Sequence, residues 1–299
     1  MAKIGMIGAG SWGTALTWLL TNNGHHVTVW SALEQEIEML KRDHEQKDKL
    51  PGVILSPDTV FTTQLSEAVE GMDLLVLAVP SPFTRSTSKQ LKDLVREGQI
   101  IVNVAKGIEE ETLLTLSQII EEEIPQAEVA VLSGPSHAEE VGKGMPTAIV
   151  AGAYRKKTAE YIQNIFMSEV FRVYASPDVL GIELGAALKN VVALAAGIAD
   201  GLGCGDNTKA ALITRGIKEI SRLGMKMGGH FESFYGLSGI GDLIVTCASM
   251  HSRNRRAGIL IGKGYSMDEA MKEVKMVVEG VYSAKAAMGL AKRYDVPLP

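Results

Sequence analysis

The fold is decided by the stretch Gly8-Ala9-Gly10-Ser11-Trp12-Gly13, which follows the short apolar run Lys3–Ile7 and opens a helical pattern. Each glycine has a separate use in this spacing. Gly8 permits a tight turn, Gly10 lets a pyrophosphate approach the backbone, and Gly13 lets the helix pack on the strand. The free N–H groups of the helix N-terminus attract the anion. Strand, turn and helix in this order favour a dinucleotide-binding site over a glycine-rich turn without a ligand.

Around this stretch, the first part of the chain alternates between apolar, β-branched runs and amphipathic helical patterns. The predicted strands are Lys3–Ile7, His26–Trp30, Asp73–Pro80, Gln99–Lys106 and Glu128–Ser133, with Pro146–Ala151 and Phe171–Ala175 as extensions. The predicted helices between them are Ala15–Asn23, Phe83–Arg96, Glu111–Glu123 and Lys156–Phe166. Strands separated by helices predict right-handed crossovers and a parallel sheet that is covered on both faces. The predicted fold class is α/β, with an N-terminal Rossmann-type doubly wound parallel sheet.

The strand pattern ends at Ser176-Pro177, and only helical patterns follow. They cover Asp178–Gly203, Thr208–Leu223, Arg255–Gly262, Met267–Lys275 and Val281–Tyr294. We therefore predict a dinucleotide-binding domain at residues 1–177 and an all-helical substrate domain at residues 178–299. Residues 179–299 carry 15 Lys and Arg against 11 Asp and Glu, so the helical half is the better host for an anionic small molecule.

The composition argues against several classes of protein. With 30 Lys and Arg against 35 Asp and Glu, and 5% aromatic residues, the chain lacks the charge and stacking platforms of a nucleic-acid binder. Two cysteines are too few for a disulfide scaffold or zinc cluster, and the histidines match no metal motif, so we expect no metal. Met1-Ala2-Lys3 enters the first strand directly, and the longest apolar run, Val191–Ala199, is short for a membrane span. We expect a cytoplasmic protein with a small-molecule partner.

Lys189 is the most informative single residue, because it lies in the apolar helical run 184–196. Its neighbours one turn away are small or apolar and cannot pair with an ammonium group. Burial disfavours the charged form of a lysine and lowers its pKa, which suits proton transfer. The alternative is a lysine whose side chain extends along the helix edge to solvent.

Four other motifs offer polar groups to a site. Lys106 ends a predicted strand, where ligands of open parallel sheets bind, although a solvated loop lysine would look the same. Ser133-Gly134-Pro135-Ser136 offers backbone donors and a hydroxyl after another strand, or an ordinary helix cap by Ser136. Asp242 follows a glycine-rich turn into an apolar segment and would suit a cation such as Lys189. Ser252-Arg253-Asn254 supplies a guanidinium, a hydroxyl and an amide that suit a phosphate group, or a plain basic surface.

The end of the second predicted strand bears on the choice of cofactor. An acidic residue there would bind the ribose hydroxyls and disfavour a 2′-phosphate, but Ser31-Ala32 occupies the position. Ser31 removes that repulsion, and Lys41 and Arg42 lie a few residues further on. The sequence therefore leans to NADP(H) without excluding NAD(H).

Taken together, these motifs resemble those of bacterial NAD(P)-dependent glycerol-3-phosphate dehydrogenases. The matching stretches occur in family order and span nearly the whole chain: Gly8–Leu16, Ala105–Ile108, Ser133–Ala138, Leu188–Val191, Gly239–Leu243 and Ser252–Asn254. Two departures from the family stand out. Ser31-Ala32 replaces an Arg of many relatives, and the chain stops at Leu298-Pro299 where relatives continue, which suggests that a C-terminal segment is missing.

The resemblance implies reversible hydride transfer between NAD(P)H and C2 of dihydroxyacetone phosphate, giving sn-glycerol 3-phosphate for phospholipid synthesis, in a cytoplasmic homodimer. It implies that Lys189 is the catalytic acid/base, with Lys106 and Asp242 as further catalytic residues. The implied substrate-binding residues are Lys106, Gly134, Ser136, Lys189, Asn190, Asp242, Ser252, Arg253 and Asn254. The implied cofactor-binding residues are Gly8, Gly10, Ser11, Trp12, Gly13, Lys106, Ala138, Arg253, Val277 and Glu279.

Two other functions stay open. A related hydroxyacid dehydrogenase would share the nucleotide-binding fold and the helix-borne lysine, but the Ser252-Arg253-Asn254 run favours a phosphorylated substrate. A non-catalytic dinucleotide sensor would need the glycine loop, but it would not need an isolated Lys189 opposite Asp242.

Overall fold

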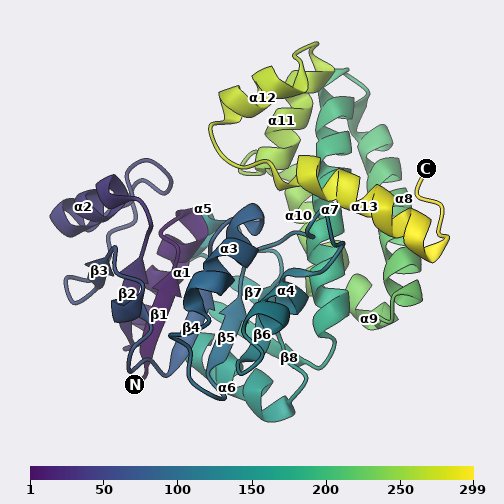
Figure 1. Cartoon of the computed structure of the whole chain (residues 1–299). Coiled ribbons are helices and arrows are strands. Elements are labelled where there is room, and N and C mark those ends of the chain that lie inside the picture. The colour runs from purple at the N-terminus through teal and green to yellow at the C-terminus, as the bar shows by residue number, and fades with distance from the viewer. The chain divides into compact units, whose positions relative to one another are not determined.

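The computed structural model describes residues 1–299, and the chain forms two compact units (Figure 1). Unit 1 comprises Met1–Ala105, Ser117–Leu132 and Ser136–Pro177, and unit 2 comprises Lys106–Leu116, Ser133–Pro135 and Asp178–Pro299. Unit 2 therefore takes up two short segments from the N-terminal half of the chain. The first segment follows one strand of the sheet, and the second begins at the last residue of another.

An eight-stranded sheet organises unit 1, with the strand order β3-β2-β1-β4-β5-β6-β7-β8. Its strands are β1 (Lys3–Ile7), β2 (His26–Trp30), β3 (Val60–Thr62), β4 (Leu74–Leu77), β5 (Ile100–Asn103), β6 (Glu128–Ser133), β7 (Thr147–Gly152) and β8 (Phe171–Ser176). All pairs from β3 to β6, and the pair β7–β8, are parallel. From β1 the chain continues to β2 and β3 on one side, whereas from β4 it continues to β5 through β8 on the other side. The direction of the strand order therefore reverses between β1 and β4. In doubly wound sheets this switch point is where ligands bind.

The sheet is buried on both faces, because alternate residues of its central strands enter different cores. In β4, Leu74 and Val76 share a core with residues of α1 (Ser11–Asn22), α5 (Ala138–Val141) and α6 (Lys156–Phe166). Leu75 and Leu77 point the other way, into a core with residues of α3 (Thr84–Leu91) and α4 (Leu116–Glu123). A strand that is apolar on both sides is typical of a parallel sheet between two helical layers. The predicted α/β fold class is confirmed.

Some elements differ from the prediction. Strand β3 and helix α2 (Glu34–Asp43) were not predicted, since α2 is strongly polar and buries only Glu36, Ile37 and Leu40. The helix predicted from Glu111 begins at Leu116. The reason is that Leu113 has a left-handed φ of 64° and that Ile108 and Thr115 form a β-bridge, so residues 108–115 make a turn.

Helix α7 (Val179–Gly201) is the central helix of unit 2 (Figure 1). The helices α8 (Gly205–Lys226), α10 (Asp242–Ala248), α11 (Arg253–Gly262) and α13 (Glu279–Tyr294) pack against it, and α9 (Phe231–Phe234) and α12 (Met267–Val274) complete the unit. A Cβ atom on Gly258 would lie 2.2 Å from the Leu194 carbonyl oxygen, so this glycine lets α11 approach α7 closely. Helix α7 is long and apolar enough to cross a membrane, but it is mostly buried within the unit, as expected of a core helix.

Candidate active site

The loop between β1 and α1 has the geometry of a phosphate-binding turn. Gly8 has a left-handed φ of 122°. A Cβ atom on Gly13 would lie 2.1 Å from the Gly8 carbonyl oxygen, so helix and strand could not approach this closely with any other residue there. A Cβ atom on Gly10 would meet nothing within 4 Å, and no side chain caps α1. The start of α1 thus has room beside Gly10 and no side-chain cap, which fits the pyrophosphate of a dinucleotide.

This geometry predicts different outcomes for two neighbouring glycine substitutions. Gly10→Ala places its methyl group in the open space, so we expect an unchanged melting temperature and about tenfold or greater loss of NADH affinity, because the methyl group blocks the pyrophosphate. Gly13→Ala places the same group against backbone, so we expect it to lower the melting temperature itself. Calorimetric titration with NADH and thermal melting of both variants provide the measurement. Unchanged NADH affinity in Gly10→Ala would contradict this use of the loop.

In unit 2, the carboxylate of Asp242 lies between two lysines. The Lys189 ammonium donates to Asp242 Oδ1 at 2.5 Å, and the Lys106 ammonium donates to Asp242 Oδ2 at 2.6 Å. Lys106 also donates to the Gly134 carbonyl oxygen at 3.0 Å. Lys189 is 5% exposed and Asp242 is 1% exposed, so the charges are held away from bulk water. The structure thus joins Lys106, Gly134, Lys189 and Asp242, which the sequence had placed in four separate motifs.

The local structure around these residues differs in two respects from the prediction. Strand β5 ends at Asn103, so Lys106 follows the strand rather than closing it. Asp242 is the first residue of helix α10 and follows a single turn of π-helix, η3 (Leu237–Gly241), where the sequence suggested only a glycine-rich turn. Turns of π-helix are rare and frequently occur at functional sites. Here the turn places the carboxylate at the beginning of the following helix.

Thr246 is a member of this cluster that the sequence analysis missed. The Lys189 ammonium donates to Thr246 Oγ1 at 2.6 Å, and that hydroxyl donates to the Asp242 carbonyl oxygen at 2.6 Å. Asp242 and Thr246 are four residues apart on α10 and therefore face the same way. The spacing of four residues was the signal in the sequence that could have identified Thr246 as a partner of Lys189. Two oxygens from one helix face thus fix the position of the Lys189 amine.

The charges of the cluster alter each other's pKa values. Burial lowers the pKa of Lys189 to about 8, an effect that the Asp242 carboxylate partly offsets and the Lys106 ammonium reinforces. Burial would raise the pKa of Asp242, but the two ammonium groups together hold it below its usual range. Asp242 is therefore a carboxylate at neutral pH, and Lys189 is an amine that can release or take up a proton near pH 8.

The Ser252-Arg253-Asn254 run begins helix α11. Ser252 Oγ caps this helix by accepting a hydrogen bond from the Arg255 N–H at 3.2 Å. Asn254 Nδ2 donates to Asn190 Oδ1 at 2.9 Å, and Asn254 Oδ1 accepts from the Gly280 N–H at 2.8 Å. Because Asn190 follows Lys189 directly, the first bond ties the first turn of α11 to the part of α7 that carries the buried amine, and the second bond ties it to α13. Arg253 is half-buried at the first position of α11.

The remaining predicted residues are divided between the units. Unit 1 holds Gly8, Gly10, Ser11, Trp12, Gly13, Ser136 and Ala138, and unit 2 holds Val277 and Glu279 beside the residues described above. Glu279 begins helix α13, directly before Gly280. Ser136 does not cap α5, because the residue before this helix is His137, which provides no side-chain cap.

A carboxylate lies at the end of β2, where the sequence analysis predicted no acidic group. Ser31 Oγ donates to Glu36 Oε2 at 2.6 Å, so helix α2 supplies a carboxylate at the position where the sequence showed none. Arg42 pairs with Asp43 and Lys41 with Glu38. The inference that Ser31 leaves this position without an acidic group is therefore wrong. Glu36 was missed because it lies five residues beyond Ser31 on a helix that was not predicted.

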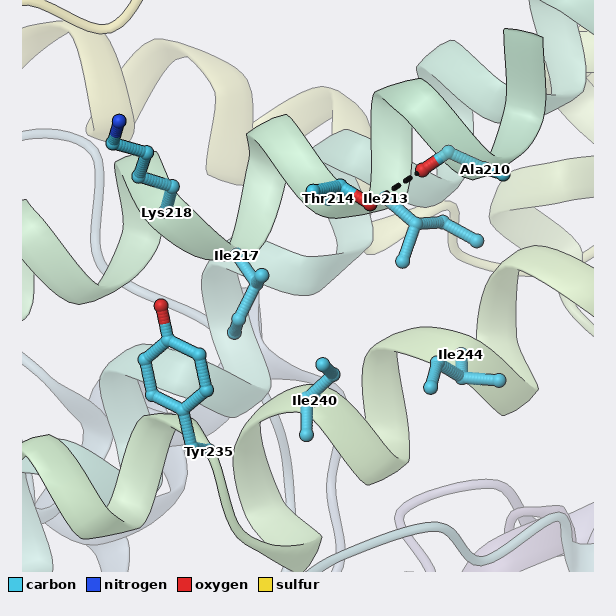
Figure 2. Close-up of a pocket in the computed structure, with 8 residues that line it drawn as sticks. All are labelled: Ala210, Ile213, Thr214, Ile217, Lys218, Tyr235, Ile240 and Ile244. Carbon is cyan, nitrogen blue, oxygen red and sulfur yellow. Dashed lines mark hydrogen bonds between the residues drawn. The ribbon is translucent and has the colours of Figure 1, made fainter. Parts of the chain in front are cut away.

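An open hollow of about 560 Å³ in unit 2 contains none of the predicted site residues (Figure 2). Its lining residues are Ala210, Ile213, Thr214, Ile217, Lys218, Tyr235, Ile240 and Ile244. The Thr214 hydroxyl donates to the Ala210 carbonyl oxygen at 2.8 Å, within its own helix. Ile240 and Ile244 line the hollow, whereas Asp242 and Thr246 contact Lys189. This apolar hollow offers no charge pair for catalysis, so the candidate active site is the lysine–aspartate cluster.

Comparison with known proteins shows to which family the chain belongs. Residues 3–159 match the model of the NAD-dependent glycerol-3-phosphate dehydrogenase N-terminus, and residues 178–299 match that of the C-terminus. The chain belongs to this family. A glycerol-3-phosphate dehydrogenase [NAD(P)+] of Agathobacter rectalis is 67% identical over 100% of this chain and 89% of its own length. The relative of the same name from Fusobacterium nucleatum is 63% identical over 100% of this chain and 90% of its own length.

A solved structure agrees with the family assignment. The crystal structure of glycerol-3-phosphate dehydrogenase from Coxiella burnetii superposes with a TM-score of 0.96 at 33% identity, covering 100% of this chain and 91% of that one. These matches confirm the resemblance read from the sequence, the fold class, and the membership in an NAD(P)-dependent family of oxidoreductases.

Proposed function

We propose that this glycerol-3-phosphate dehydrogenase family member interconverts dihydroxyacetone phosphate and sn-glycerol 3-phosphate with NAD(P)H as the hydride donor. The observation that carries the proposal is the buried Lys189 amine, held by Asp242 and Thr246 and with its pKa lowered to about 8. A reaction that converts a carbonyl to an alcohol needs one proton at oxygen for each hydride at carbon. An amine with this pKa can exchange that proton at neutral pH.

Each residue of the cluster has its own part in the proton and hydride transfer. A nicotinamide cofactor, when bound, would supply the hydride for C2 or accept it in the reverse direction. Lys189 donates its proton to the oxygen on C2 as negative charge develops there, and takes it back during oxidation. Lys106, fixed by Asp242 and the Gly134 carbonyl, orients the same carbonyl oxygen. Asp242 keeps both ammonium groups in place and prevents them from repelling each other.

The substrate phosphate needs a separate anion site. Arg253 at the start of α11, together with the N-terminus of that helix and the Asn254 amide, supports such a site, because the Asn254–Asn190 bond ties it to the turn of Lys189. Binding energy at the phosphate orients the reacting carbon without contacting it. The further residues proposed to bind the substrate are Gly134, Ser136, Asn190 and Ser252. Besides the glycine loop, the residues proposed to contact the cofactor are Ser11, Trp12, Lys106, Ala138, Arg253, Val277 and Glu279.

The same proposal implies a cellular role and an oligomeric state. The product is the backbone of glycerophospholipids, so the chain would act in phospholipid synthesis in the cytoplasm, as a homodimer. A related hydroxyacid dehydrogenase and a non-catalytic sensor are the competing functions.

Initial rates of NADH and NADPH oxidation test the proposal. We expect turnover with dihydroxyacetone phosphate and at least about a hundredfold lower kcat/KM with pyruvate and other unphosphorylated ketoacids, because they lack the phosphate group whose binding energy orients the substrate. Equal rates with the unphosphorylated ketoacids would favour the hydroxyacid dehydrogenase. Cofactor binding without turnover of any of these substrates would favour the sensor.

A further inference from the structure

We propose that Glu36 recognises the adenosine ribose of the cofactor and makes this chain select NAD(H) over NADP(H). The inference rests on the proposed function and deepens it, because the family accepts either nucleotide and the sequence alone leaned to NADP(H). Glu36 is 7% exposed and lies on helix α2, outside the motifs that identify the family. Its carboxylate contacts Ser31, the residue that follows strand β2.

A continuous chain of hydrogen bonds connects Glu36 to the glycine loop. Gln46 Nε2 donates to the Ala9 carbonyl oxygen at 2.9 Å and to Glu36 Oε1 at 2.7 Å. Ala9 lies inside the glycine loop, and Ser31 lies at the end of β2. In a doubly wound sheet, a nucleotide whose pyrophosphate binds the first loop places its adenosine ribose at the end of the second strand. Glu36 and Gln46 therefore lie where the adenosine ribose of a bound dinucleotide would be recognised.

The cluster has acceptors left over that suit a hydrogen-bond donor from the ligand. A carboxylate offers about four acceptor positions, and Ser31, Gln46 and Lys49 use three of those on Glu36. Gln46 is fully buried, and its Oε1 atom accepts no hydrogen bond. A ribose 2′-hydroxyl carries a proton and can donate to the Glu36 carboxylate, which is 7% exposed, whereas Gln46 stays buried behind it. A 2′-phosphate dianion has only acceptors to offer and adds charge of the same sign as the carboxylate.

The cations near the end of β2 already have carboxylate partners. Lys49 pairs with Glu36 itself, and Arg42 pairs with Asp43 at 2.7 Å. Lys47 also pairs with Asp43, at 3.0 Å, and Lys41 pairs with Glu38 at 3.7 Å. A 2′-phosphate would have to share each of these cations with a carboxylate of the same sign of charge. In the Glu36→Gln variant, Lys49 loses its partner, so the same position changes from a neutral pair to a cation.

Binding of ADP-ribose and 2′-phospho-ADP-ribose, measured by calorimetry, tests this assignment without relying on catalysis. We expect the unmodified protein to bind ADP-ribose at least about tenfold more tightly, and Glu36→Gln to abolish or reverse that preference. Glu38→Gln is the matched control: it makes the same change on the same helix, at an exposed residue, and should keep the preference. Adding Lys49→Met to Glu36→Gln should weaken 2′-phospho-ADP-ribose again. The ratio of kcat/KM with NADPH and NADH should change in parallel.

The outcomes separate this inference from the proposed function. Equal or preferential binding of 2′-phospho-ADP-ribose by the unmodified protein, or an unchanged preference in Glu36→Gln, would overturn the role of Glu36. If Glu36→Gln does not fold, Lys49→Met alone decides the matter: it leaves the carboxylate unpaired and should sharpen the preference for ADP-ribose, and a weakened preference would overturn the inference. Selective ADP-ribose binding without turnover of dihydroxyacetone phosphate would support the inference and overturn the proposed function instead.

Discussion

Replacing Lys189 by methionine is expected to lower kcat for reduction of dihydroxyacetone phosphate by about 10²–10⁴-fold, the usual contribution of a positioned general acid. Methionine keeps most of the apolar stem inside the core around α7 and removes only the ammonium group. Asp242 keeps Lys106 as a partner, so its carboxylate is not left without a counter-charge. NADH affinity, measured by calorimetry, and the melting temperature should stay close to those of the unmodified protein.

The control for this variant is Lys226→Met, which removes an exposed ammonium group at the end of α8. It should keep full activity, which separates the loss of a particular proton donor from the loss of one positive charge. If Lys189→Met folds, binds NADH and turns over normally, Lys189 is not the acid/base.

The second large effect is expected for Asp242→Asn, which removes the charge that holds both lysines. Breaking a buried ion pair from one side costs about 3 kcal/mol or more, because the remaining charge stays buried without compensation. We expect a loss of this order in the free energy of unfolding at neutral pH, measured by urea denaturation, with a strong fall in kcat. The stability loss should shrink as the pH rises toward about 8, because without Asp242 the pKa of Lys189 falls further and a neutral amine needs no counter-charge.

Asp206→Asn is the matched control for Asp242→Asn. Asp206 pairs with Lys209 at 3.5 Å, but its side chain is 100% exposed, so the same chemical change should cost almost nothing. An equal loss of stability in both variants would show that burial of the Asp242 pair contributes nothing, and would contradict the electrostatic account of the site.

The sequence predicted those features that depend on local pattern. The apolar run around Lys189 predicted its burial, because a lysine among small and apolar residues on a core helix has nowhere to place its charge except against a partner. The isolated Asp242 predicted that partner for a similar reason. The alternation of strands and helices predicted the sheet, because residues such as Leu74 and Leu75 must be buried on opposite faces.

Features that depend on how distant segments meet could not be predicted. Glu36 reaches Ser31 only because α2 folds back onto the end of β2, and the polar composition of α2 concealed the helix. Thr246 is four residues from Asp242, but this spacing identifies a shared helix face only once α10 is known to begin at Asp242. Lys106 belongs to unit 2 because of the path that the chain takes after β5, and no local sequence pattern predicts that path.

The pH dependence of kcat/KM in both reaction directions tests the central claim most directly. Lys189 must carry its proton to reduce dihydroxyacetone phosphate and must lack it to oxidise glycerol 3-phosphate. With a pKa of about 8 for Lys189, kcat/KM for reduction should fall as the pH rises above that value, and kcat/KM for oxidation should rise toward a plateau. Opposite profiles that cross near pH 8 and vanish in Lys189→Met are the predicted result. Profiles that stay flat through that region, or that persist in Lys189→Met, would contradict the assignment of the buried amine as the acid/base.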